Sequence, residues 1–511
     1  MDARGNGHAA GNGHHHNGGA SLGVPLLESR SKEDVGLLER PALEEIRKEA
    51  KHQVRLGTPV VMMGVLDFSV ILVSVGFVGR LGALPLAGAA MAASFANVFG
   101  FAILEGLSGG LETSAGQAHG AGQHQLTGLL LQRGILVLLM FCIPISVLWL
   151  YSPAVLLFWG QAPEIVELSG QYVLYMLPGL FATACFLPVV KFLQVQGITA
   201  PLAIIACIVL CLHIPLCWFF IYAIKLGFIG AAIATSASNT CTLILLVLYL
   251  NFEPSGILER TWPGWTLAAS RNLGPFLSLA LPACAMTSFE WWVFEIVQIM
   301  AGWLPHPDVN VAAMTISFQT TGLCFMLPLG LATAVGVRVA NELGAQRPGR
   351  ARWAVYVGMV LATIVGGILA IVLLVSRNEW ALLFTNPSET EVVRLVASVM
   401  PCIVLSIVGV SWSTVLSGVL RGSGQQFAGS IVNGVALYGI ALPAAYYIGI
   451  RKQLGVEGLW WGMMVGVFAQ IVGQTVLAGK TDWVDQARRA LARIDESSVE
   501  FDTKQSCDWE A

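Results

Sequence analysis

Residues 279–296 read LALPACAMTSFEWWVFEI, an apolar run that contains two carboxylates, Glu290 and Glu295. An α-helix needs about 20 predominantly apolar residues to cross the hydrocarbon core of a bilayer, and the run around this stretch is long enough. A lone charge inside hydrocarbon costs at least about 2.5 kcal/mol, so such a carboxyl group faces an interior cavity or carries a proton. The stretch therefore predicts a membrane-spanning helix whose acidic groups have a function.

The composition of the whole chain extends this prediction. Of the 511 residues, 55% are hydrophobic and 12% are charged, which excludes an ordinary soluble globular protein. About twelve apolar runs reach the length of a membrane span, and no alternating pattern indicates a β-barrel. We therefore expect an all-α integral membrane protein with twelve transmembrane helices, at about residues 57–80, 88–110, 128–150, 168–190, 198–222, 228–250, 272–300, 310–332, 352–376, 393–418, 426–449 and 456–479.

Four short patterns recur in the same order in the two halves of the chain. Pro59-x7-Asp67 returns as Pro282-x7-Glu290, 223 positions later. The other pairs, displaced by up to 228 positions, are Gly120-Ala121 with Gly344-Ala345, Leu193-x3-Gly197 with Leu420-x3-Gly424, and Leu226-Gly227 with Leu454-Gly455. Such a repeat predicts two pseudo-symmetric six-helix lobes related by an axis along the membrane normal, as in secondary transporters. The expected segments are a largely disordered tail at 1–55, lobes at 56–250 and 272–480, a linker at 251–271 and a C-terminal tail at 481–511.

Lys and Arg residues near the span ends are divided unevenly between the two membrane faces. If both termini are cytosolic, 17 of these residues lie inside and six lie outside, namely Arg80, Lys225, Arg377, Arg394, Arg451 and Lys452. This bias follows the positive-inside rule, so we expect both tails and the linker in the cytosol. The segment 33–38, EDVGLL, has the form of an acidic dileucine sorting signal. The expected location is the vacuolar membrane or the plasma membrane.

The sequence contains no spacing typical of a catalytic nucleophile and its base, of a metal cluster or of a phosphate-binding loop. We therefore predict no enzyme activity, no cofactor and no metal site. The expected partners are a small organic solute, protons and the lipid bilayer, without nucleic acid, and we expect a monomer.

Asp67 and Glu290 lie at equivalent positions of the two halves, far from either end of their apolar runs. A carboxyl group that takes up a proton on one side of a membrane and releases it on the other couples transport to a proton gradient. Glu290 is the stronger candidate, and Glu295, about 140° further around the helix, is the weaker one. The alternative is that Glu290 is only hydrogen-bonded inside a packed bundle. Aromatic side chains beside an acid, such as Trp291, suit flat or cationic organic substrates.

Several segments resemble the multidrug and toxic compound extrusion (MATE) transporters, in their plant detoxification branch. They are FVGRLGALPLAGAAMAASFANVFGF at 77–101, GLETSAGQAHGA at 110–121, FEWWVFE at 289–295, LPLGLATAVGVRVANELGAQRPGRAR at 327–352 and VLSGVLRGSGQQ at 415–426. The resemblance extends in order from about Leu56 to Lys480. It implies a proton-coupled antiporter that exports organic cations, alkaloids, phenolics or flavonoids, or a hormone from the cytosol.

The resemblance also assigns roles to individual residues. Glu290 matches the family's proton and substrate site, Gln319-Thr320 matches a polar pair of the eighth span, and Asn433 matches an asparagine of the eleventh. Tyr438 is a further candidate substrate contact in that span. Many plant members carry a second acid in the tenth span, where this chain has Val410. Either Glu290 acts alone, Glu295 or Asp67 substitutes, or coupling differs. The rival functions are an uncoupled channel and a membrane receptor with the same fold.

Overall fold

The computed structural model describes residues 42–253, 256–385 and 389–505. In this part of the chain, twelve helices are long and apolar enough to cross a membrane, which confirms the predicted number of spans. The same residues contain no β-strand. Because a helix bonds its own backbone groups, it is suited to hydrocarbon surroundings where water is absent. The predicted all-α fold class is confirmed.

The first lobe contains the first six spans. They are α2 (Leu43–Gly79), a bent span of α3 (Ala83–Ala96), η2 (Asn97–Phe101) and α4 (Ala102–Gly120), then α5 (His124–Leu150), α7 (Pro163–Val195), α8 (Ala200–Trp218) with η3 (Phe219–Ala223), and α9 (Phe228–Phe252). The short α6 (Ser152–Phe158) joins α5 to α7, and the linker between the lobes forms α10 (Ile257–Thr261) and η4 (Leu267–Ser270).

The second lobe repeats this arrangement. Its spans are α11 (Leu273–Ala301), α12 (Pro307–Gly344), α13 (Pro348–Ser376), α14 (Thr390–Ser423), a broken span of α15 (Gln426–Asn433), η6 (Gly434–Ala441), α16 (Leu442–Ala445) and η7 (Tyr446–Arg451), and α17 (Gly455–Gly479). The short η5 (Trp380–Leu383) joins α13 to α14, and α18 (Trp483–Gln505) follows the last span. The π-helical segments η6 and η7 interrupt regular backbone bonding, as they often do near functional sites.

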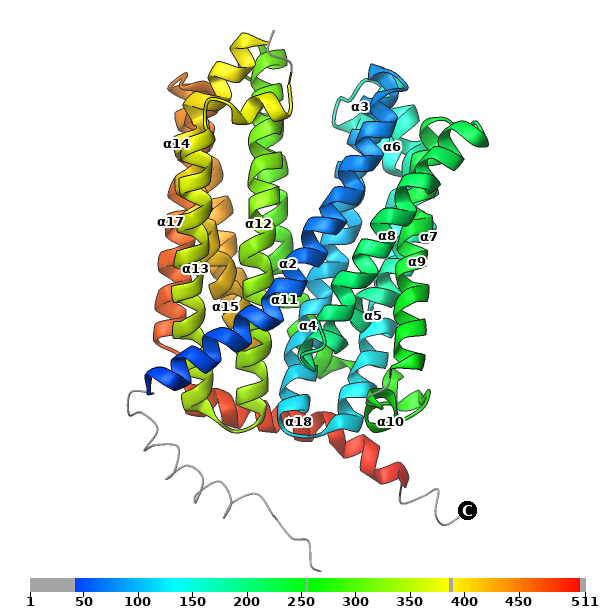
Figure 1. Cartoon of the computed structure of the whole chain (residues 1–511), viewed down its shortest axis with the longest axis vertical. Helices are drawn as coiled ribbons and strands as arrows, with labels where there is room; N and C mark the ends of the chain where they lie inside the picture. Colours follow the sequence, from blue (N-terminus) through cyan, green and yellow to red (C-terminus); the bar gives the residue numbers. More distant parts are fainter. Residues whose placement is uncertain (1–41, 254–255, 386–388, 506–511) are drawn as a thin grey trace, which may run out of the picture. The chain divides into compact units, whose positions relative to one another are not determined.

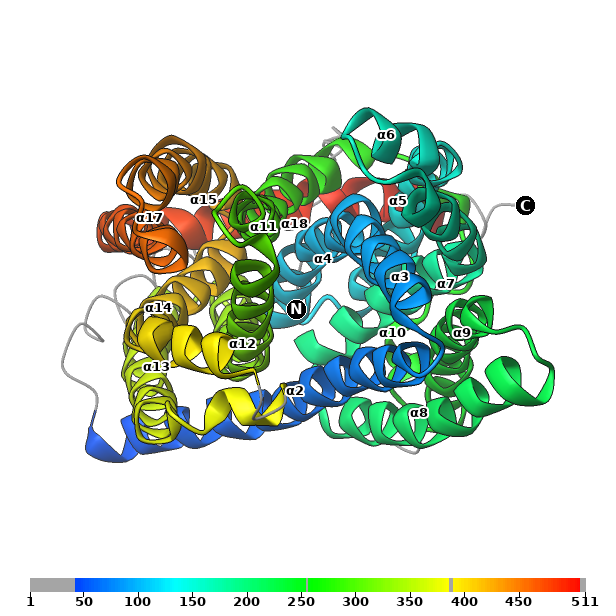
Figure 2. The ribbon, with the colours of Figure 1, turned by 90° about the horizontal axis from the view of Figure 1, so that it is seen from above.

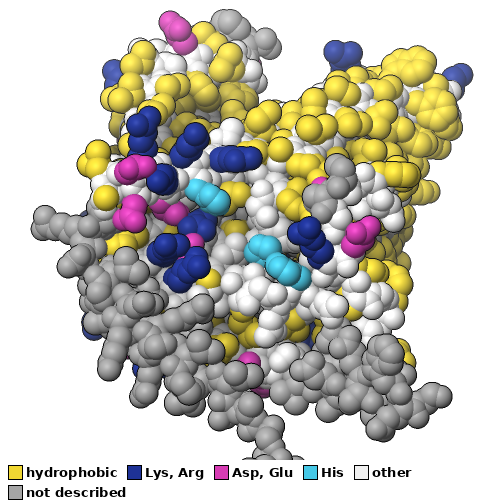
Figure 3. All heavy atoms as spheres, turned by 60° about the horizontal axis from the view of Figure 1, so that its bottom comes forward, with side chains coloured by type: hydrophobic (Ala, Val, Ile, Leu, Met, Phe, Trp, Pro, Cys, Tyr) yellow, Lys and Arg dark blue, Asp and Glu magenta, His cyan; other side chains and the backbone are white. Residues whose placement is uncertain are grey.

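The two lobes diverge away from α18, which crosses the opposite end of the bundle (Figure 1). The space-filling view shows a notch between the lobes at the far end from the face that carries α18 (Figure 3). We call the end of the bundle that α18 crosses the α18 face. At the α18 face the lobes are joined, since α4 packs against α11, α12 and α14 of the second lobe. The fold is therefore open on one side of the membrane and closed on the other.

Helix α2 belongs to both lobes. It runs along one side of the bundle from α12 and α13 to α8 and α9 (Figure 2). The prediction of a disordered tail up to residue 55 is wrong for residues 43–55, which form the first turns of this helix. These residues are mostly charged, yet Gln53 is buried against the second lobe and Glu44 and Glu45 lie in the first turn, where the helix dipole favours acids. Residues 1–41, with the dileucine pattern at 33–38, lie outside the described part.

The repeated leucine and glycine residues form the same cap at the ends of two helices. Gly197 and Gly424 both have left-handed backbone conformations, with φ of 78° and 80°, that favour glycine. The backbone N–H of the residue after each glycine donates to the carbonyl of Leu193 (2.9 Å) or Leu420 (2.8 Å), which closes the same helix cap in both lobes. The repeated leucine and glycine therefore mark equivalent ends of α7 and α14.

Helix α18 connects the two lobes at the closed end of the bundle. It packs against α4, α11, α12 and α13, and so touches both lobes. Arg493 of α18 donates to the Gln117 side chain of α4 at 2.9 Å, while Gln346, just after α12, donates to the backbone carbonyl of Ala487 at 2.6 Å. The C-terminal segment thus holds the two lobes together on the α18 face.

Candidate functional site

Glu290 of α11 lies at the centre of a polar cluster inside the second lobe. Its Oε1 atom accepts hydrogen bonds from Ser417 of α14 (2.9 Å), Asn433 of α15 (2.9 Å) and Gln470 of α17 (3.0 Å). The Oε2 atom takes no hydrogen bond from the described residues, and the side chain is only partly buried. One oxygen is therefore fixed by three donors, while the other is left for a proton or a ligand.

A second layer of bonds orients these donors. Gln474 of α17 donates to Ser417 Oγ and to Asn433 Oδ1, both at 3.0 Å. Gln470 also donates to Asn433 Oδ1 at 3.0 Å, and Asn433 donates to the carbonyl of Met286 at 3.1 Å. Because each donor is held by a neighbour, the cluster presents a fixed hydrogen-bonding site to the carboxyl group.

The local sequence explains this arrangement. Gln470 and Gln474 are four residues apart on α17, which places both on one face of the helix. Asn433 is the last residue of α15, directly before the π-helical η6. The sequence-based candidates included Asn433 but omitted Ser417, Gln470 and Gln474. The i, i+4 pair of amides in an otherwise apolar span was the signal that would have indicated the two glutamines.

The other predicted residues of the second lobe differ in their surroundings. Tyr438 packs edge-on against Phe289 with ring centroids 5.2 Å apart, and its buried hydroxyl has no hydrogen-bond partner among the described residues. Thr320 accepts a 2.7 Å bond from the Trp380 indole and donates to the backbone of its own helix, so its hydroxyl is already bonded. Trp291 and Gln319 are partly exposed. None of these four has a hydrogen bond to Glu290.

Glu295 lies outside the Glu290 cluster. It accepts a 2.6 Å hydrogen bond from Ser94 of α3, and the neighbouring Trp292 indole donates to the carbonyl of Val98 at 2.9 Å. Both contacts join α11 to the first lobe. Val410, the position at which the family resemblance implies a second acid, is a buried residue of α14.

The acids of the first lobe form a separate charged network. Lys191 of α7 lies 2.8 Å from Glu105 and 3.7 Å from the buried Glu112, both on α4. Arg421 of the second lobe lies 4.0 Å from the same Glu112 carboxylate, and it is also within electrostatic reach of Glu290. Asp67 has an exposed side chain on α2 and no ion-pair partner among the described residues. The ionic groups of this network therefore extend from Glu105 across the seam to Arg421.

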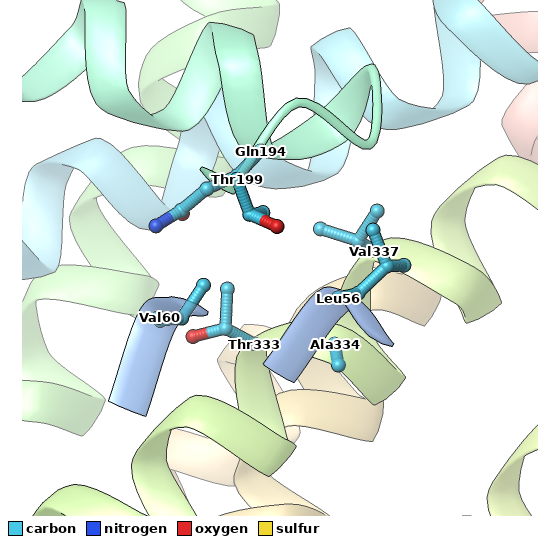
Figure 4. Close-up of a pocket in the computed structure, with 7 residues that line it drawn as sticks. All are labelled: Leu56, Val60, Gln194, Thr199, Thr333, Ala334 and Val337. Carbon is cyan, nitrogen blue, oxygen red and sulfur yellow. The ribbon is translucent and has the colours of Figure 1, made fainter. Parts of the chain in front are cut away.

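A small pocket lies where α2, α7 and α12 meet. Its lining residues are Leu56, Val60, Gln194, Thr199, Thr333, Ala334 and Val337 (Figure 4), and its empty volume is about 160 Å³. Pockets for organic ligands usually measure about 300–1,000 Å³. None of the predicted site residues lines it, so it is a packing gap between the lobes rather than a substrate site.

A protein-family model described as MatE matches residues 59–219 and 282–447, once in each lobe. The chain belongs to the MATE family of transporters. The second MATE match begins 223 positions after the first, which is the displacement that relates Asp67 to Glu290. This result confirms the family resemblance of the sequence motifs.

Comparisons with individual proteins agree with this family assignment. The chain is 37% identical to Protein DETOXIFICATION 16 of Arabidopsis thaliana, over 89% of this chain and 92% of that protein. It is 35% identical to Protein DETOXIFICATION 3 of the same plant, over 88% and 94%. The crystal structure of the eukaryotic MATE transporter AtDTX14 is similar, with a TM-score of 0.84, 34% identity and coverage of 88% and 99%. The Vibrio cholerae MATE transporter VcmN shares the fold, with a TM-score of 0.73, 21% identity and coverage of 88% and 99%.

The MATE fold and family are those of a transporter and not of an enzyme. A carboxyl group with one fixed and one unbonded oxygen can bind a proton or a ligand reversibly, without covalent chemistry.

Proposed function

We propose that this MATE transporter exports organic solutes from the cytosol in exchange for protons, by alternating access between its two lobes. The observation that carries the proposal is the half-bonded carboxyl group of Glu290, with three donors on Oε1 and none from the described residues on Oε2. Oε2 can take a proton without loss of the existing bonds. The same oxygen, when unprotonated, can bind a substrate.

In the proposed cycle, deprotonated Glu290 binds substrate while the cleft opens to the cytosol. After the lobes rock, a proton from the acidic lumen or apoplast adds to Glu290 and removes both its charge and a hydrogen-bond acceptor. Substrate then leaves, and the protonated carboxyl group returns to the cytosolic side and releases its proton. By linkage, a substrate that prefers the charged carboxylate competes with the proton for it.

The first lobe contributes the second acid of the proposed mechanism. Asp67 is exposed on α2, whereas Val410 is apolar and buried. Val410 stands at the position where the family resemblance implies a second acid in many plant members. Glu105 of the same lobe is already paired with Lys191 at 2.8 Å, whereas Asp67 has no ion-pair partner among the described residues. Glu295 is the weaker candidate, because its carboxylate is already bonded to Ser94.

The proposed substrate contacts, besides Glu290 itself, are other candidates of the second lobe. Trp291 and Gln319 are partly exposed, and Tyr438 has an unbonded hydroxyl beside the Phe289 ring. Asn433 bonds directly to Glu290, and the Thr320 hydroxyl is held by the Trp380 indole. An acid beside aromatic rings favours organic cations, alkaloids, flat phenolics such as flavonoids, or a hormone of similar character.

We further propose that the α18 face is cytosolic and that the protein acts as a monomer in the vacuolar or plasma membrane. The excess of Lys and Arg on this side supports the orientation. With this orientation, the notch between the lobes opens away from the cytosol, in the state that would release substrate and receive protons.

The test is substrate flux in sealed vesicles with an imposed pH step. Concentrative uptake of a cationic or phenolic substrate that a protonophore abolishes is the expected result for the antiporter. Passive equilibration to equal concentrations would indicate a channel, and binding without flux would indicate a receptor. Either of these two outcomes overturns the proposed exchange.

A further inference from the structure

The α18 face carries a concentration of positive charge where α2 meets α13. Figure 3 shows Lys and Arg side chains gathered on one part of this face, below one of the lobes. The exposed cations of the two helices and of the turn before α13 are Arg47, Lys48, Lys51, Arg55, Arg347, Arg350 and Arg352. We call these seven residues the α2–α13 basic patch. They come from segments about 300 positions apart, so the fold and not the local sequence brings them together.

Buried contacts hold the two helices in this register. Gln53 of α2 is fully buried and donates to the carbonyl of Ala354 of α13 at 2.8 Å. Lys51 and Arg55 lie two residues on either side of Gln53, and Arg352 lies two residues before Ala354. A step of two residues is about 200° around a helix, so these cations point away from the shared contact and lie on the outer faces of the two helices.

Three acids near the patch are already paired, two of them with a cation outside it. Glu49 receives two bonds from the half-buried Arg338, at 3.0 and 2.8 Å, and Glu342 lies 2.7 Å from the same guanidinium. Within the described residues, Lys48 is the one member of the patch with an ion-pair partner, Glu44 at 2.8 Å. The remaining cations are available for an external anion.

A lipid-facing stripe begins at the patch. On α13, the exposed apolar residues Tyr356, Val360, Ile364 and Ile368 follow Arg352 at intervals of four, so they share one face of a helix able to span the membrane. The Arg352 guanidinium lies 5.6 Å from the centre of the Tyr356 ring and donates to its hydroxyl at 3.2 Å. An aromatic residue and an arginine at such a boundary mark the level of lipid headgroups.

We propose that the α2–α13 basic patch binds an anionic phospholipid. Its phosphate lies among Arg350, Arg352 and the α2 cations Lys51 and Arg55, and one acyl chain follows the stripe from Tyr356 to Ile368. Arginine suits the headgroup because its planar guanidinium forms paired hydrogen bonds with phosphate oxygens. A phospholipid satisfies both halves of this surface at once, whereas a soluble phosphate satisfies only the charged half. The binding does not depend on the direction or coupling of transport.

The experiment measures lipid binding by the full-length protein in neutral detergent. The protein is titrated with fluorescent phosphatidylglycerol, and separately with fluorescent phosphatidylcholine, in the wild type and in the R350Q/R352Q variant. Because each cation near an anionic lipid contributes about a fivefold factor, the double variant should bind phosphatidylglycerol about 10- to 30-fold more weakly. Phosphatidylcholine should bind weakly and equally to both proteins.

Two control variants and one competitor separate binding at this site from general electrostatic attraction. The R451Q/K452Q variant removes two exposed cations at the opposite membrane face that also lie over tyrosine rings, Tyr446 at 5.8 Å and Tyr447 at 5.6 Å, and it should bind like the wild type. The R350K/R352K variant keeps the charge but loses the paired hydrogen bonds, so its affinity should fall between those of the wild type and R350Q/R352Q. Glycerol phosphate should not displace the lipid at equal concentration. Equal affinity of wild type and R350Q/R352Q, an equal loss in R451Q/K452Q, or displacement by glycerol phosphate overturns the proposal.

Discussion

Gln117 of the first lobe and Asn341 of the second make the same hydrogen bond across the seam between the lobes. The Gln117 amide donates to the carbonyl of Gly422 at 3.3 Å, and the Asn341 amide donates to the carbonyl of Val195 at 3.0 Å. The donors are 224 positions apart in the sequence, and the acceptors are 227 apart. Equivalent contacts therefore occur twice at the closed end of the protein, as the pseudo-twofold axis requires.

Two glycines make this close approach possible. A Cβ atom at Gly120 would collide with the carbonyl of Asn341, and one at Gly344 would collide with the carbonyl of Gln117. In Gly120→Ala the backbone of Asn341 must shift, and in Gly344→Ala the backbone of Gln117 must shift. Overpacking of this kind typically lowers the free energy of unfolding by about 1–3 kcal/mol. We expect a lower thermal unfolding midpoint in detergent and slower transport in vesicles. Gly367→Ala, where nothing lies within 4 Å, is the matched control and should behave like the wild type. Unchanged stability of the seam variants would contradict this account.

Removal of the Glu290 charge tests the proposed coupling directly. Glu290→Gln keeps the size of the side chain but can neither take up nor release a proton. We expect normal expression and proton-driven uptake reduced to the level of empty vesicles. Asp67→Asn should lower uptake substantially without abolishing it, because Glu290 remains. Wild-type flux in Glu290→Gln would exclude a coupling role for this residue.

The donors of Glu290 should control the pH at which transport changes. Gln470→Leu removes a 3.0 Å bond to Oε1, and a hydrogen bond to a charged group contributes about 1.5–3 kcal/mol. The loss destabilises the deprotonated form, so the carboxyl group stays protonated to a higher pH. The pH profile of uptake should move upward by about one to two pH units. Gln298→Leu is the matched control, since Gln298 lies on the same helix as Glu290 but bonds to Thr315 at 3.4 Å. An unmoved profile in Gln470→Leu, or an equal movement in the control, would count against the role of the cluster.

The sequence predicted the spans, the repeat and Glu290, because these depend on local composition and spacing. Apolar length identifies a span whatever its neighbours are, and a carboxylate in such a span is conspicuous. The partners of Glu290 were mostly missed, since Ser417 and Gln470 lie 127 and 180 positions away from it and single polar residues are common in helix packing. Residues 43–55 were misassigned for a related reason. Their charge resembles a solvated tail, and only the distant Ala354 carbonyl shows why Gln53 is buried.

The ion pairs at the seam between the lobes predict that two glutamates of α4 contribute unequally to the stability of the protein. Glu112 is 1% exposed and lies between Lys191 and Arg421, whereas the Glu105 side chain is 36% exposed and pairs with Lys191 alone. Glu112→Gln removes the ion-pair partner that Arg421 has among the described residues, and removing one partner of a buried pair typically costs about 3–5 kcal/mol. In Glu105→Gln, water reaches the site and Lys191 keeps Glu112, so the cost should be near the roughly 0–1 kcal/mol of an exposed pair. Thermal unfolding in detergent should therefore show a much larger fall for Glu112→Gln. Equal falls, or a larger fall for Glu105→Gln, would mean that Glu112 does not hold the lobes together.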